Sequence, residues 1–139
     1  MRIIIPPITR PISLTDYAPE LAREDGAPVV VHVWVNPPAR MIDEYRQLLA
    51  TAQTLRQQLE TPQTGEELKV LGGQLVAIGE RFSEWYAEIW SKHADAGTHW
   101  TTQDVRDLAT SETDPDLHNW LRSRTWDLIT AHRTGEKKA

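Results

Sequence analysis

Residues 29–59, VVVHVWVNPPARMIDEYRQLLATAQTLRQQL, are the stretch that decides the fold. Valine occupies every second position at its start, so an extended chain would place four valines on one face: Val29, Val31, Val33 and Val35. Asn36-Pro37-Pro38 then favours a helix start, with Asn36 as the cap and Pro37 in the first turn. From Met41 to Leu59, apolar residues recur at the spacing of an amphipathic helix of about five turns. The stretch therefore predicts a strand that leads directly into a long helix.

The residues before this stretch are typical of strand and loop. Seven of the nine prolines of the chain lie within residues 1–38, and proline breaks helices. Ile12 and Leu14 alternate with polar residues, which predicts a short strand with one buried face, and Gly26 suits a turn. We expect a small antiparallel sheet in which Arg2–Ile5 is available as a third strand. A lone hairpin is marginally stable in water, so this sheet must pack on helices.

The residues after the stretch predict three more helices. Thr64-Gly65-Glu66-Glu67 reads as a capping box, and the helix it begins runs toward Gly97 with Gly72-Gly73 inside it. Two glycines within a helix indicate a kink or a close backbone approach. A short third helix begins at Thr101-Thr102, and a fourth begins at Asp114-Pro115 and stops before Gly135.

These elements define the expected architecture. The class is α+β and helix-dominated, with a small N-terminal antiparallel sheet packed on about four helices. Residues 1–139 form a single domain, which divides into a β-rich part (1–38), a helical part (39–133) and a flexible tail (134–139).

Composition narrows the function classes. The net charge is −5 and basic residues are interleaved with acidic ones, whereas nucleic-acid binding requires clustered Lys and Arg. The first apolar run is three residues long before two prolines, too short for a signal peptide or a membrane span. We therefore expect a soluble cytoplasmic protein that contacts neither nucleic acid nor membrane.

One cluster of polar side chains is a candidate metal-binding or catalytic site. His93, Asp95 and His99, with Asp104 close behind, are side chains of the types that bind zinc. Their spacing matches no tight metal motif, and polar capping of a helix connection is the preferred interpretation. The chain contains no cysteine, no G-x-S-x-G elbow and no P-loop. We predict no enzyme activity, no metal and no cofactor.

The six tryptophans are more informative. Trp85 and Trp120 fall on apolar stripes and are expected in the core. Trp34 points away from the valine face of its strand, while Trp90 and Trp126 sit at the edges of their stripes. Large aromatics off the core face serve as anchors in protein interfaces, so these three are candidate partner-binding residues, with burial in the core as the alternative.

Four segments together resemble the tail assembly chaperones of long-tailed, siphovirus-type bacteriophages and their prophages. They are ISLTDYAPEL (12–21), VHVWVNPPARMIDEY (31–45), EIWSKHADAGTHWTTQDVRDLA (88–109) and DPDLHNWLRSRTWDLITAHR (114–133). The resemblance implies binding of the tape measure protein and of major tail tube subunits in the host bacterial cytoplasm, without catalysis. It also implies absence from the mature virion. Such genes often yield a longer frameshifted product, with which Glu136-Lys137-Lys138 is compatible.

Other readings stay open. The chain could be a phage structural or adaptor protein, for tail or head completion, that remains in the particle. An enzyme would place its site at the His93–His99 loop. A homo-oligomer is also compatible with the sequence, because an exposed strand such as Ile3–Ile5 could pair within one chain or across subunits.

Overall fold

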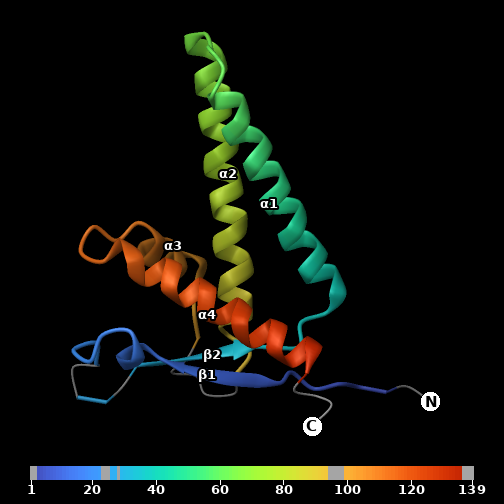
Figure 1. Cartoon of the computed structure of the whole chain (residues 1–139), viewed down its shortest axis with the longest axis vertical. Helices are drawn as coiled ribbons and strands as arrows, with labels where there is room; N and C mark the ends of the chain where they lie inside the picture. The colour runs from blue at the N-terminus through green and yellow to red at the C-terminus, as the bar shows by residue number, and fades with distance from the viewer. Residues whose placement is uncertain (1–2, 23–25, 28, 94–98, 136–139) are drawn as a thin grey trace.

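The computed structural model describes residues 3–22, 26–27, 29–93 and 99–135. Within them it confirms a helix-dominated α+β fold with a two-stranded antiparallel sheet. The elements follow the order β1 (Thr9–Ser13), the 3-10 turn η1 (Leu14–Asp16), β2 (Val30–Trp34), α1 (Ala39–Leu59), α2 (Gly65–Ile89), α3 (Thr102–Ala109) and α4 (Pro115–Thr134). The sheet forms the base, α4 lies across it, and α1 and α2 project from the base as a long hairpin (Figure 1).

The valine pattern of the sheet is confirmed. β1 pairs with β2 so that Thr9 lies opposite Trp34 and Ser13 opposite Val30. Val31, Val33 and Val35 have no exposed surface, because this face of the sheet lies against the helices. Burial on one face sets the register, since a slip by one residue would turn Val31, Val33 and Val35 toward solvent.

The expected third strand is not formed at residues 3–5, and the role expected for Asn36 was wrong. The side-chain oxygen of Asn36 accepts a hydrogen bond from Ile8 N at 2.7 Å, and its Nδ2 donates to Pro6 O at 3.1 Å. The N-cap of α1 is Pro38, which has no side-chain cap. Asn36 thus holds the N-terminal segment, and Pro6 and Pro7, which have no amide hydrogen to donate to a ladder, separate residues 3–5 from β1.

Three predicted helix starts are confirmed by their caps. Thr64 accepts from Glu67 N at the start of α2, Thr101 and Asp104 form a reciprocal capping box on α3, and Asp114 accepts from Leu117 N on α4. α2 ends at Ile89 rather than near Gly97, which lies outside the described residues. Gly135 follows the last residue of α4, as expected.

The core lies where the sheet meets α4 and the lower parts of α1 and α2. Its fully buried side chains include Val31, Val33, Ile89, Trp90, Val105, Leu121 and Ile129. No described helix is long and apolar enough to cross a membrane.

Candidate protein-binding arm

The α1–α2 hairpin, named here the arm, is joined to the body by a buried polar network. The Tyr45 and Tyr86 hydroxyl oxygens are 2.6 Å apart. The Tyr86 oxygen lies 3.2 Å from Arg122 Nε and 3.0 Å from Trp126 Nε1, both of which donate. Arg122 also donates from Nη2 to the Tyr45 oxygen at 3.0 Å. The network links α1, α2 and α4 and therefore sets the direction in which the arm leaves the body.

The charge states of this junction are fixed near neutral pH. Burial raises the pKa of Tyr86, so its hydroxyl stays protonated. Burial also lowers the pKa of His118 to about 4, helped by the positive charge of Arg122, so His118 stays neutral. The Arg122 guanidinium lies 5.3 Å from the centre of the Tyr86 ring. This arrangement holds α1, α2 and α4 together at the base of the arm.

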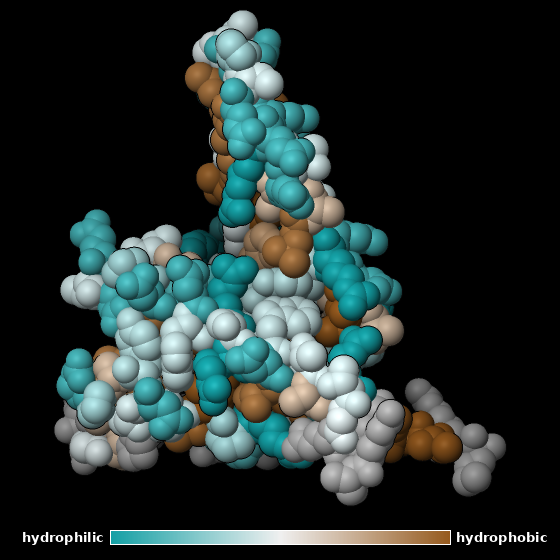
Figure 2. All heavy atoms as spheres, viewed as in Figure 1, coloured by the Kyte–Doolittle hydropathy of each residue, from teal (hydrophilic) through white to brown (hydrophobic). Residues whose placement is uncertain are grey.

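One face of α2 remains open along the arm. Leu68, Gly72 and Val76 are spaced four residues apart and therefore form one row on the helix. Leu68 is 48% exposed and Val76 is 69% exposed. A Cβ added at Gly72 would meet no heavy atom within 4 Å. Figure 2 shows apolar surface along one edge of the arm beside a polar front. We call these three residues the α2 row.

The α2 row is open because α3 covers only the lower part of α2. α3 packs on α2 through the fully buried Val105, and Arg106 bridges to Glu80 at 3.0 Å. Leu71 is buried and Leu75 and Ile78 are half-buried, while residues 68 and 76 stay exposed. α2 thus carries more apolar surface than one neighbouring helix can cover.

The arm tip has a second apolar feature on another side of α2. Val70 is 61% exposed and lines a groove of about 510 Å³ with Gln58, Glu67 and Gln74. Two leucines of α1, Leu49 and Leu59, are 45% and 39% exposed. Large exposed apolar side chains therefore gather on the arm, where no other described element lies over them.

The three candidate tryptophans have different surroundings. Trp90 is fully buried and donates from Nε1 to Thr125 Oγ1 at 3.0 Å, so its selection as a surface anchor is corrected: it belongs to the core. Trp126 is half-buried and stacks on Trp85 with ring centres 5.3 Å apart, as part of the junction. Trp34 is half-buried, and Lys92 Nζ lies 4.7 Å from the centre of its ring. Partner binding through Trp34 or Trp126 stays a prediction.

Of the two tryptophans expected in the core, Trp85 is buried as predicted and Trp120 is only half-buried. Trp85 is 2% exposed and donates to Met41 O at 2.8 Å. Trp120 is half-buried against the core and lies beside Tyr17, with ring centres 5.3 Å apart.

The histidine cluster does not assemble into a site among the residues that are described. His93 stacks on His32 with ring centres 3.7 Å apart, while His99 is exposed. Asp95 lies outside the described residues. Asp104 caps α3, and its hydrogen bonds with Thr101 lower its pKa. Within the described ranges no three His, Asp or Glu side chains gather closely enough to hold a metal ion.

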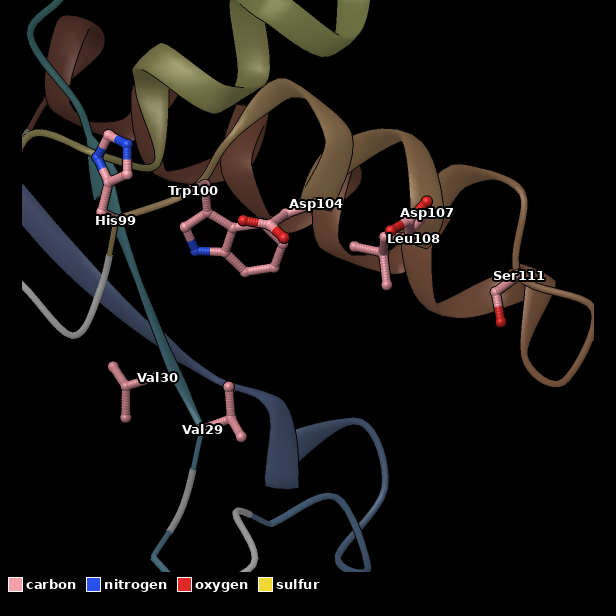
Figure 3. A pocket seen from close by; sticks show the side chains of 8 residues that line it. All are labelled: Val29, Val30, His99, Trp100, Asp104, Asp107, Leu108 and Ser111. Carbon is pink, nitrogen blue, oxygen red and sulfur yellow. The ribbon is translucent and has the colours of Figure 1, made fainter.

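A cleft of about 490 Å³ lies between α3 and the start of β2 (Figure 3). Its walls are apolar at Val29, Trp100 and Leu108. Its two carboxylates already have partners, because Asp104 caps α3 and Asp107 accepts from Gln103 at 2.6 Å. The cleft presents a mainly apolar surface rather than an assembled catalytic set.

The chain matches no family model, no curated protein and no solved structure.

The open α2 face was not recognised from the sequence, although two signals pointed to it. Gly72-Gly73 predicts a kink or a close approach, but α2 runs as one helix from Gly65 to Ile89, and a Cβ at either glycine would meet no heavy atom within 4 Å. Val70 and Val76 fall outside the inner stripe of α2, and apolar residues on several sides of one helix indicate an additional neighbour.

Proposed function

We propose that this chain binds other proteins without catalysis, as a chaperone of phage tail assembly. In this proposal the arm holds an amphipathic helix of the tape measure protein and the complex recruits major tail tube subunits in the host cytoplasm. The chaperone is then released and does not enter the virion. The observation that carries the proposal is the exposed α2 row on a projecting two-helix arm. The partner identities rest on the family resemblance.

The physical argument is that two helices cannot bury all the apolar surface of this arm. A third amphipathic helix laid along the α2 row would cover Leu68 and Val76, the helix-in-groove mode of recognition. Gly72 has no side chain, so the backbone of the partner could approach closely there. Both side chains are only partly exposed at present, so their burial would stabilise the complex by roughly 1–2 kcal/mol each. A contact of this size suits a chaperone that must release its client.

The direct test is co-expression with a tape measure protein, the long helical client that the family resemblance implies. We expect that protein to be soluble and to co-purify only when the chain is present. Mass spectrometry of purified virions should find the chain absent. Its presence at high copy number would instead identify a structural or adaptor protein that is retained in the particle.

Matched variants locate the surface. Val76 and Val70 have similar exposure and lie on the same helix, about 120° apart around its axis. We expect Val76→Asp to abolish co-purification and Val70→Asp to preserve it, with both variants folded by circular dichroism. Loss with Val70→Asp alone would move the site to the tip groove, and binding by both variants would exclude the arm.

A further inference from the structure

An apolar segment projects from the other end of the molecule. Ile3, Ile4 and Ile5 are 80%, 81% and 73% exposed, and they belong to no strand. The segment leaves the base beside the sheet (Figure 1) and forms an apolar projection (Figure 2). A run of three exposed apolar residues is unfavourable on a protein surface and is expected only where it contacts something. We call residues 3–5 the isoleucine segment.

The residues that follow this segment are hydrogen-bonded to the chain just after β2. Val35 N donates to Ile8 O at 2.9 Å, and Asn36 bonds to Ile8 N and to Pro6 O. Pro6 and Pro7 restrict the backbone between this anchor and the isoleucines. The isoleucine segment therefore leaves the body at a fixed point.

A cavity of about 710 Å³ opens beside these hydrogen bonds, between residues 5–8 and the chain that follows β2. Its lining is mainly apolar, with Asn36 and His132 as its polar members and Ile5 of the same chain at its wall; the other lining residues are Pro7, Ile8, Trp34, Pro37 and Pro38. The indole N–H of Trp34 is buried, and the described residues provide no acceptor for it. Apolar side chains that enter this cavity would cover its walls.

We propose that two copies of this chain associate by exchanging their isoleucine segments, each of which enters the cavity of the other copy. The donor segment and the receiving cavity lie at one end of one chain, so a two-fold axis there satisfies both at once. A second copy carries both the matching segment and the matching cavity, so one self-complementary surface covers the exposed isoleucines and fills the cavity of each chain.

The area buried between the two copies indicates how tightly they associate. Burial of an isoleucine removes about 60–120 Å² of apolar surface from water, so six isoleucines remove roughly 360–720 Å². With a similar area on the cavity walls, the total is roughly 700–1,400 Å², a range around the lower limit of about 1,200 Å² for stable interfaces. We therefore expect a weak dimer that depends on concentration.

Sedimentation equilibrium of the full chain, from low micromolar to millimolar concentration, tests the proposal. We expect the average mass to rise from monomer toward dimer. Ile4→Asp should raise the dissociation constant by more than about tenfold, because each dimer loses two buried isoleucines. Trp34→Phe should weaken dimerisation less. Val76→Asp should leave it unchanged, which separates this proposal from helix binding by the arm.

A disulfide trap identifies the contact directly, because the chain contains no cysteine. Copies carrying Ile4→Cys are mixed with copies carrying Pro38→Cys and oxidised; Val76→Cys replaces Pro38→Cys as the control. We expect a mixed disulfide dimer only with Pro38→Cys. A monomer at every concentration would overturn the proposal, as would a dimer that Ile4→Asp leaves intact. Dimerisation that begins only after removal of residues 136–139 would also overturn it, because the chain's own tail would then be the occupant.

Discussion

Tyr86→Phe is the sharpest test of how the arm is attached. The substitution keeps the ring and removes one oxygen that serves Tyr45, Arg122 and Trp126 at 2.6, 3.2 and 3.0 Å. Arg122 retains its bond to the Tyr45 oxygen at 3.0 Å, so the guanidinium is not left without a partner. Trp126 is half-buried, so water can reach it in part. The main loss falls on the indole N–H of Trp126 and on the Tyr45 hydroxyl.

These losses can be converted into a stability change. An unsatisfied buried donor costs about 1–3 kcal/mol, and a lost neutral hydrogen bond costs about 0.5–1.5 kcal/mol. We expect Tyr86→Phe to lower the free energy of unfolding by about 2–3 kcal/mol. For a chain of this length the melting temperature should fall by roughly 6–12 °C. Urea titration and scanning calorimetry measure both quantities.

Tyr17→Phe is the matched control. The Tyr17 hydroxyl donates a single bond, to Asp114 at 2.8 Å, and the side chain is half-buried. Its loss should lower the free energy of unfolding by less than Tyr86→Phe does, because this hydroxyl has one partner and lies near solvent. Tyr45→Phe combined with Tyr86→Phe should be non-additive, since the two hydroxyls share one network. Equal effects of Tyr86→Phe and Tyr17→Phe, or strict additivity with Tyr45→Phe, would refute the view that the network acts as a unit.

Three further predictions address the arm, the pH response and a helix cap. Gly72→Ala and Gly73→Ala should each raise the free energy of unfolding by about 0.8–1 kcal/mol in a denaturation experiment, because neither added Cβ meets a neighbour. Only Gly72→Ala should weaken helix binding by the arm, as measured by co-purification. The free energy of unfolding should fall as pH drops from about 6.5 to about 4, since His118 binds a proton in this window when unfolded but not when folded. His118→Gln should flatten this part of a plot of urea midpoint against pH. An unchanged plot would contradict the lowered pKa of His118. Asp114→Ala should cost about 1–2 kcal/mol through the lost α4 cap and the lost Tyr17 bond; an effect below that of Tyr17→Phe alone would count against the cap.

The local elements could be predicted from sequence because their signals lie within a few residues of each other. Alternating valines indicate a strand with one buried face, and Thr64, Thr101 and Asp114 each cap the helix that follows them. The prediction that Asn36 caps α1 is wrong because its partners are distant in the chain. Asn36 has a local signature as a cap, but its actual partners, Ile8 and Pro6, lie almost thirty residues upstream.

The candidate surfaces depended on tertiary structure. Trp34 lies off the valine face of its strand and Trp90 at the edge of its stripe, so both are candidate anchors in the sequence. In the structure Trp34 is half-buried beside a cavity, whereas Trp90 is fully buried against Thr125. The α2 row is apolar in the sequence, but only the short reach of α3 leaves it exposed. Periodicity determines which residues share a face of an element. Which faces meet depends on contacts between residues far apart in the chain, and one sequence carries no local signal for them.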